Sequence, residues 1–205
     1  MALAAYLDDA PLVNVEAEES LESARSRYFR ALGSSGIDYD AWWIRIPIGG
    51  IEMGIPNPPA HGRALRAHDL HHVLTGYSTS LVGECEISAW ELGGGSGAYV
   101  AAIGFDVAGT GLGLLLAPRR TLVAFARGRR GRNLFRRRYG HELLDRSVLS
   151  VRRELGIGPD PEPGAADVVR FAFWSSLGVL SLALWPLTWL LISATCLMPP
   201  PREHA

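Results

Sequence analysis

The chain has 205 residues with a formal net charge of −1, and 48 % of its residues are hydrophobic. This length suits one domain with a real core, and the composition argues against disorder and against bulk nucleic-acid binding. The only two cysteines, Cys85 and Cys196, provide neither a disulfide framework nor the spacing of a zinc ribbon. All 20 basic residues are arginine, which we attribute to coding bias and not to function.

Residues 1–19 form an acidic tail. Its first residues lack a basic start, and Asp8 and Asp9 interrupt the apolar run, so we predict no signal peptide. A helix is predicted near 19–33, ended by the Gly-Ser-Ser-Gly run at 33–36. Four apolar residues keep helical spacing in it: Leu21, Ala24, Tyr28 and Leu32.

Residues 41–60 combine a strand-like pattern with several prolines. The segment 42–48 alternates briefly like a strand, but Pro47 argues against a central position in a sheet. Pro56, Pro58 and Pro59 then predict an extended approach to the next helix. We expect the pair at 42–43, two tryptophans, to be core or membrane-facing and not part of a ligand cage.

Three of the six histidines lie in the sequence His68-Asp69-Leu70-His71-His72, within a helix predicted over about 62–75. On one helical turn His68 and His72 share a face, with Asp69 beside His72. Two imidazoles at this spacing can present nitrogen ligands to one divalent ion. The alternative is that these histidines are ordinary surface or core-edge residues. His71 lies on another face, where we favour a solvent-facing position over a role as a base behind the site.

Glu84 follows His72 by twelve residues. On one straight helix this separation would carry it about 18 Å along the axis. The break at 76–80, Gly-Tyr-Ser-Thr-Ser, allows a second helix over about 80–92 to fold back and bring Glu84 to the two histidines. Such nitrogen and oxygen ligands suit zinc, iron or manganese without choosing among them. Cys85, next to Glu84, is predicted to lie in the core.

Residues 98–117 are apolar and rich in small residues, with Asp106 as the only charge. Their length allows a membrane span, but we prefer a buried helix. The glycine runs at 93–97 and 109–113 lack the spacing of phosphate-binding loops, and the chain has no lysine. Nucleotide binding is therefore not expected.

A basic block follows without any acidic residue. It contains Arg119, Arg120, Arg127, Arg129, Arg130, Arg132, Arg136, Arg137 and Arg138. The block is either a solvated helical face or a surface for anionic lipid headgroups or phosphate esters, and no motif supports nucleic-acid binding. An apolar stripe at helical spacing then runs up to Gly156. It is formed by Leu144, Val148, Val151 and Leu155. Residues 159–169, which contain several prolines, are predicted to be a linker.

The segment 170–198 is predicted to be a C-terminal hydrophobic membrane helix, with 199–205 as a tail. Phe171 to Met198 contains no charge and exceeds the roughly 20 residues that span a bilayer. Pro186 leaves open a kinked span or a re-entrant hairpin, and a buried soluble helix is the alternative. Arginine lies mainly before this segment, so we expect an inner (cytoplasmic) membrane protein whose main domain faces the cytoplasm.

The chain contains the motif His68-Asp69-x-x-His72, which is followed after eleven further residues by Glu84. This motif resembles the hallmark of the Coq-four family of coenzyme Q (ubiquinone) biosynthesis. The flanking residues through Gly76 and the pair Gly83-Glu84 are similar to that family. So are Asn133-Leu134-Phe135 and the run at 151–157, Val-Arg-Arg-Glu-Leu-Gly-Ile. The likeness covers roughly residues 20–158.

The resemblance implies an all-α fold with a hydrophobic tunnel for a polyprenyl lipid at the membrane surface. It implies that His68, Asp69, His72 and Glu84 are metal ligands and catalytic groups. The family acts on a polyprenylated benzoate-type quinone precursor, with oxidative decarboxylation at the first ring carbon as the proposed step. The partners implied are this precursor, membrane lipids and other quinone-biosynthesis proteins, without nucleic acid, and a homo-oligomer is expected.

Two alternatives remain open. One is a non-catalytic scaffold that binds the prenyl lipid and organises a quinone-biosynthesis complex. The other is a metal-dependent hydrolase of a lipid or prenyl phosphate. This sequence departs from the family in its dense arginine block and its charge-free C-terminal segment, and both leave the quinone substrate open.

Overall fold

The computed structural model describes residues 18–31, 38–48, 51–57, 59–96, 99–137, 139–184, 187 and 190. Most of them are helical, as predicted. The elements in chain order are α2 (Leu21–Ala31), β1 (Trp43–Ile48), β2 (Ile51–Pro56), α3 (Pro59–Thr75), α4 (Leu81–Gly94), α5 (Val100–Leu116), α6 (Pro118–Arg130), the 3₁₀ turn η1 (Leu134–Arg136), α7 (His141–Leu144), α8 (Val148–Leu155) and α9 (Ala165–Ala183). The predicted tail 199–205 and most of the tail 1–19 lie outside the described residues.

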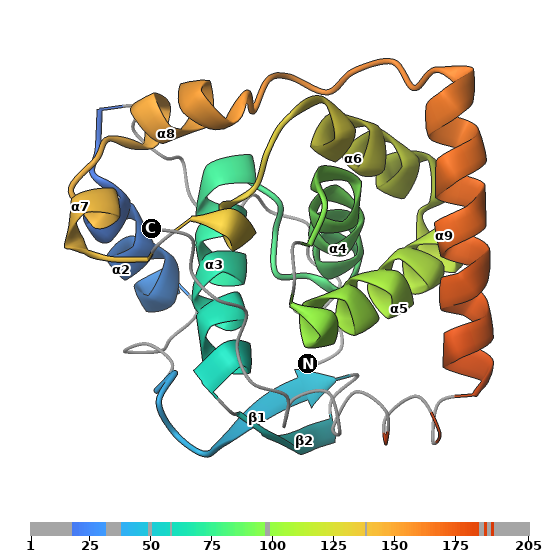
Figure 1. The fold of residues 1–205 in the computed structure, drawn as a ribbon, viewed down its shortest axis with the longest axis horizontal. Helices are drawn as coiled ribbons and strands as arrows, with labels where there is room; N and C mark the ends of the chain where they lie inside the picture. Colours follow the sequence, from blue (N-terminus) through green and yellow to red (C-terminus); the bar gives the residue numbers. More distant parts are fainter. Residues whose placement is uncertain are drawn as a thin grey trace.

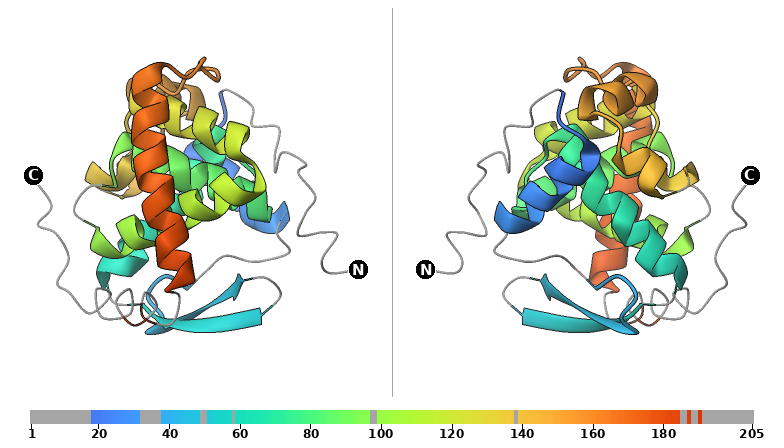
Figure 2. Two further views of the ribbon diagram at one scale, coloured as in Figure 1. Left: turned by 90° about the vertical axis from the view of Figure 1, so that its right-hand side faces the viewer. Right: turned by 90° about the vertical axis from the view of Figure 1, so that its left-hand side faces the viewer.

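Helix α3 stands at the centre of the fold (Figure 1). Helices α2, α7 and α8 lie on one side of it, and α4, α5 and α6 lie on the other. Helix α9 packs against α5 and α6 and covers the outside of that group (Figure 2). The start of α2 is tied to the start of α8, since Leu21 N–H donates to the carbonyl of Arg146 and Val148 N–H donates to that of Glu19.

The core fills the space around α3 and α4. Its largest fully buried apolar side chains are Trp90, Phe125, Leu21, Leu70, Leu74 and Ile87. Helix α3 also buries polar residues, among them His61, Asp69, His71 and His72. A helix that is enclosed on several sides has no solvated face for its polar residues, so each of them needs a hydrogen-bond partner inside the protein.

The predicted strand near residue 42 is confirmed, but its partner β2 was not predicted. The two strands form an antiparallel hairpin with Trp43 opposite Pro56 and Ile48 opposite Ile51. Pro47 fits because each strand of a two-stranded sheet has a free edge. Trp42 and Trp43 are 60 % and 58 % exposed, so they are not core residues. That they face a membrane stays a prediction.

Small residues set the distances between the helices on the α9 side. A Cβ atom on Gly128 of α6 would lie 2.0 Å from the carbonyl oxygen of Trp90 in α4. A Cβ atom on Gly178 of α9 would lie 2.1 Å from the carbonyl oxygen of Val107 in α5. Both pairs of helices therefore touch backbone to backbone, and larger residues would force them apart.

Helix α5 is buried in its middle and exposed at its ends. Asp106, Val107 and Ala108 are buried, whereas Leu115 and Leu116 at its C-terminal end are exposed. The prediction of a buried helix over 98–117 is thus confirmed for the face that contacts α4 and α9 and wrong for the end. Cys85 is buried in the core, as predicted.

Helix α9 begins at Ala165, so the predicted linker 159–169 is too long by about a helical turn. By length and composition α9 can cross a membrane, with a mean hydropathy of 1.3, but it is the single such helix among the described residues and therefore weak evidence. It packs through Phe171, Ser175 and Gly178 and exposes large apolar residues on the opposite face. Except for residues 187 and 190, the predicted segment beyond residue 184 lies outside the described residues.

Three arginines of the block pair with acidic residues that are distant in the sequence. Arg120 pairs with Glu86 of α4 at 2.7 Å. Arg129 and Arg130 both pair with Asp167 at the start of α9. Arg120 and Arg130 are exposed, as a solvated face predicts, but they are paired with acids from other helices. The reading as an unpaired surface for anions is therefore wrong for these residues.

The helical stripe before Gly156 is buried as predicted but belongs to two helices. Leu144 ends α7, and Val148, Val151 and Leu155 lie on α8. Ser147 separates the helices and caps α8 by accepting a hydrogen bond from the N–H of Ser150.

Candidate metal centre

The predicted return of the chain between the two site helices is present. Gly76 follows α3 with a φ of 82°, a conformation that favours glycine and ends the helix. Ser80 caps α4 by accepting a hydrogen bond from the N–H of Gly83. A Cβ atom on Gly83 would lie 2.1 Å from the carbonyl oxygen of Ser78, so this glycine lets the first turn of α4 pack against the loop. Glu84 follows directly and faces α3.

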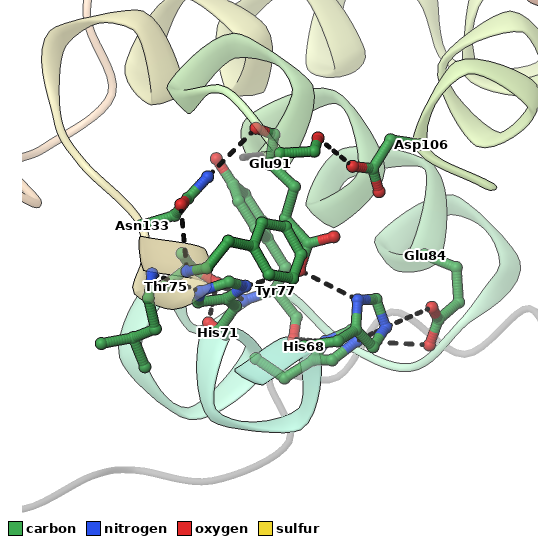
Figure 3. Close-up of polar contacts among 12 residues, drawn as sticks. His68, His71, Thr75, Tyr77, Glu84, Glu91, Asp106 and Asn133 are labelled. Carbon is green, nitrogen blue, oxygen red and sulfur yellow. Dashed lines mark hydrogen bonds and ion pairs between the residues drawn. The ribbon is translucent and has the colours of Figure 1, made fainter. Parts of the chain in front are cut away.

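His68, His72 and Glu84 come together as the sequence predicts (Figure 3). The Nε2 atoms of the two histidines lie 3.3 Å apart. Each Nε2 lies 3.4 Å from one oxygen of the Glu84 carboxylate. Two metal–ligand bonds of about 2.1 Å at the tetrahedral angle place their ligand atoms about 3.4 Å apart. The three groups therefore fit one small divalent ion, and the described residues hold no further cluster of this kind.

The other ring nitrogens of both histidines are held by hydrogen-bond acceptors. His72 Nδ1 lies 3.0 Å from the carbonyl oxygen of Tyr77, which can only accept. His68 Nδ1 lies 3.0 Å from Oε1 of Glu91. Each Nδ1 therefore carries a proton, and when the ring is neutral its Nε2 has the lone pair free toward the shared centre. Carboxylates and carbonyls behind ligating histidines are typical of metal sites in proteins.

His71 is not solvent-facing, so that prediction is wrong. It is fully buried and its Nδ1 lies 2.5 Å from Oε1 of Glu91. Its Nε2 accepts a hydrogen bond of 2.9 Å from the N–H of Leu134. Both ring nitrogens are thus satisfied, and His71 connects α3 to α4 and to η1. Its place behind Glu91 makes it a supporting residue of the site and not a ligand.

Glu91 receives a third contact from the buried Asp106 of α5, whose carboxylate also accepts a hydrogen bond from Ser96 (Figure 3). Burial and the charge of Glu91 raise the pKa of Asp106 well above its usual range. Asp106 therefore holds a proton that it can donate to Glu91. The buried carboxylate of Glu91 in this way accepts hydrogen bonds from His68, His71 and Asp106.

The charges of the ligand groups favour a cation at their centre. Burial alone would raise the pKa of Glu84, but His72 and His68 outweigh it and hold that pKa well below its ordinary value. Burial alone would lower the pKa of His68, but Glu91 and Glu84 raise it well above its ordinary value. Glu84 is therefore ionised at neutral pH, and a metal ion must compete with a proton for His68.

Asp69, the fourth predicted ligand, is not part of the three-residue cluster. It is buried beside His68 and His72, and its carboxylate accepts a hydrogen bond from the hydroxyl of Tyr39. Burial raises the pKa of Asp69, although His68 and that hydrogen bond oppose the rise. Its role as a ligand stays a prediction.

Three residues of the site were not predicted from the sequence, namely Glu91, Asp106 and Tyr39. Glu91 carried a usable signal, because it follows Glu84 by seven residues and therefore lies on the same face of a helix, two turns later. Asp106 was visible as the one charge in an apolar segment, but nothing in the pattern indicated which helix it would contact.

Three protein ligands leave a tetrahedral ion one open position, which is the arrangement of catalytic and not of closed structural sites. The open side lies toward Glu84 and His68, whose side chains are 37 % and 23 % exposed, while the His72 side chain is 1 % exposed. Comparisons with known protein families, with curated proteins and with solved structures found no match. The chemistry of the site is therefore argued from its own geometry.

Proposed function

We propose that this chain is a membrane-associated, divalent-metal-dependent protein of ubiquinone biosynthesis. Its substrate is a polyprenylated benzoate-type quinone precursor, and its reaction is the oxidative decarboxylation at the first ring carbon. The proposal is carried by one observation: the residues at the motif positions 68, 72 and 84 meet at distances of 3.3 and 3.4 Å that suit one ion. The family is proposed from the resemblance of the motif, and the geometry gives a physical reason for the spacing of the motif.

In this proposal His68, His72 and Glu84 hold the ion, and Glu91 fixes the ring of His68. The ring of Tyr28 stacks on His72 at 5.9 Å between centroids and closes that side of the site. When bound, a divalent ion supplies a Lewis acid for the ring carboxylate, and iron or manganese also supplies redox chemistry with dioxygen. The substrate ring approaches from the exposed side of Glu84.

The exposed face of α9 supports the membrane association. Its large apolar side chains recur at helical spacing and include Val169, Phe173, Leu177, Leu180 and Leu184. An apolar stripe of this length on a helix that is packed on its other face is typical of a helix lying in a membrane interface. A protein that rests on the bilayer can draw a polyprenyl substrate from it without exposing the chain to water.

The test uses cells that lack this chain and are rescued with the wild type, with Glu84→Ala or with Glu142→Ala. Glu142 is exposed on α7 and has no role in the site, so it is the matched control. Lipid quinones are analysed by mass spectrometry. We expect the empty strain and Glu84→Ala to accumulate a prenylated precursor that keeps its ring carboxylate, and Glu142→Ala to restore the quinone. Unchanged quinones in all strains would exclude this pathway.

The second candidate is a non-catalytic scaffold that holds the prenyl lipid for partner enzymes. The apolar face of α9 favours it as well, because that face can hold lipid whether or not the metal site is active. In the same experiment a scaffold predicts that Glu84→Ala restores the quinone while the empty strain does not.

A further inference from the structure

A second site lies on the other side of α4 from the metal centre. A cavity of about 590 Å³ opens between α6, the loop after α3, α4 and the segment before α9. Its charged and hydroxyl-bearing lining includes Tyr77, Glu86, Arg119, Arg120, Arg127 and Asp160. The volume is that of a small-molecule site, and three guanidinium groups face two carboxylates. None of the three metal-cluster residues lines it.

Arg127 is a buried cation whose charge is poorly compensated. It is 8 % exposed, and its guanidinium donates to two carbonyl oxygens, those of Gly158 at 2.8 Å and Thr75 at 3.2 Å. The nearest carboxylate is that of Asp160 at 3.7 Å, and this side chain is 65 % exposed. A buried charge without a close partner is costly, so an anion in the cavity would be bound favourably.

Tyr77 offers a hydrogen-bond donor at the same place. Its hydroxyl oxygen is buried, and no acceptor in the described part of the chain takes its proton. Its ring lies 5.3 Å from the guanidinium carbon of Arg127, and both residues line the cavity. A buried hydroxyl usually finds an acceptor, and the oxygen of an anion would provide one.

The remaining charges of the cavity leave a cationic excess. Arg120 makes two hydrogen bonds to Glu86, of 2.9 and 2.7 Å, which neutralise that carboxylate. Arg119 is exposed and forms no ion pair with any residue that the structure describes. Among the carboxylates that line the cavity, Asp160 is therefore left to balance Arg127, and it is exposed and 3.7 Å away.

We propose that this cavity binds a phosphate monoester, held by Arg119 and Arg127 and by the hydroxyl of Tyr77. Arginine recognises phosphate oxygens through paired N–H donors, and the phosphate has enough oxygens for all three groups. The ester is either a soluble metabolite or the headgroup of a phosphatidic-acid-like lipid. Because the metal ligands do not line the cavity, the phosphate is bound there and not hydrolysed. The site is independent of the proposed quinone chemistry.

The test titrates the full chain, in detergent micelles, with inorganic phosphate and with glycerol phosphate by calorimetry. We expect Arg119→Gln and Tyr77→Phe each to weaken binding by about tenfold, as the loss of one charge-assisted contact does. Arg30→Gln, an exposed arginine on α2 away from the cavity, removes the same charge and should leave binding unchanged. Metal affinity measured on Arg119→Gln should equal that of the wild type, which shows that the variant is folded.

A second arm identifies the source of the phosphate. The full chain is mixed with phosphatidylcholine vesicles with and without phosphatidic acid, and bound protein is separated by flotation. Binding of glycerol phosphate that depends on Arg119, without a gain in flotation, assigns a soluble ester. A gain in flotation with phosphatidic acid that is lost in Arg119→Gln assigns the lipid headgroup. The proposal is overturned if the chain binds none of inorganic phosphate, glycerol phosphate and phosphatidic-acid vesicles. It is also overturned if Arg30→Gln weakens binding as much as Arg119→Gln.

Discussion

Glu91→Gln should weaken the binding of a divalent metal although Glu91 is not itself a ligand. The carboxylate is 1 % exposed and accepts hydrogen bonds from His68 Nδ1 at 3.0 Å and His71 Nδ1 at 2.5 Å. An amide has one acceptor oxygen, so its NH₂ group would face a ring N–H or the proton of Asp106. In either orientation the negative charge behind His68 would be lost. Where the NH₂ group takes the place of Oε1, the ring of His68 would also no longer be held with its Nε2 toward the metal.

The expected loss of metal affinity is about 10-fold to 100-fold, which is about 1.4 to 2.8 kcal/mol. The assay is a competition titration of the purified chain with Zn²⁺ against a chromophoric chelator, well below the melting temperature found by circular dichroism. Glu142→Gln, which changes the same group on the surface, should match the wild type. His71→Gln should lower the melting temperature clearly but should change the metal affinity little, because His71 does not contact the metal position.

The reasoning is refuted if His68→Ala abolishes binding while Glu91→Gln stays within about twofold of the wild type, since supporting groups of real metal sites give larger losses. If the wild type itself binds no divalent ion, the metal site and the proposed function fail together. A large loss of affinity in Glu142→Gln would point to unfolding or to net charge and not to the orientation of His68.

Three further predictions concern the frame around the site. Asp167→Asn should destabilise the chain by about 1 kcal/mol at pH 7, since the Gly164 N–H and two arginines hold the pKa of Asp167 below its ordinary value against burial. This stability is present above the unfolded pKa and is lost as the pH falls through the folded pKa, so wild type and variant should melt alike in strong acid. Gly178→Leu should lower the melting temperature by several degrees because its Cβ would meet the α5 backbone, whereas Gly158→Ala, with open space around it, should not. Phe173→Ser should reduce flotation with phosphatidylcholine vesicles by roughly tenfold or more, as the loss of one buried aromatic anchor predicts, and unchanged flotation would exclude this face of α9 from the membrane.

The cluster of His68, His72 and Glu84 could be predicted because its determinants are local in the sequence. His68 and His72 are one helical turn apart, Gly76 ends the helix, and Ser80 starts the next one. These features also fix the direction in which Glu84 returns. The resemblance named the same residues, but the helical spacing and the caps give the physical reason for their meeting.

The parts that escaped prediction depend on long-range packing. His71 was placed on a solvent face because a helical wheel assumes one buried side, whereas α3 is enclosed by helices on several sides. The strand β2 contains Gly54 and ends at Pro56, two residues that disfavour strands, and it pairs only because β1 lies beside it. The partners of Arg120 and Arg129 lie 34 and 38 residues away in the sequence, so no local pattern could reveal them.

Helix α6 connects the metal centre to α9 through its arginines. At its C-terminal end Arg129 and Arg130 pair with Asp167, which caps the start of α9. One turn earlier Arg127 donates to the carbonyl of Thr75, two residues before the carbonyl of Tyr77 that orients His72.

The links made by the arginines are charge-assisted hydrogen bonds, and Arg127 and Asp167 are buried. These hydrogen bonds therefore fix the relative positions of the exposed face of α9, the phosphate cavity beside Arg127 and the metal centre. If α9 rests on a bilayer, α6 fixes the height of the metal centre above the bilayer. That height then sets the length of polyprenyl tail that must leave the membrane for the ring to reach the metal centre.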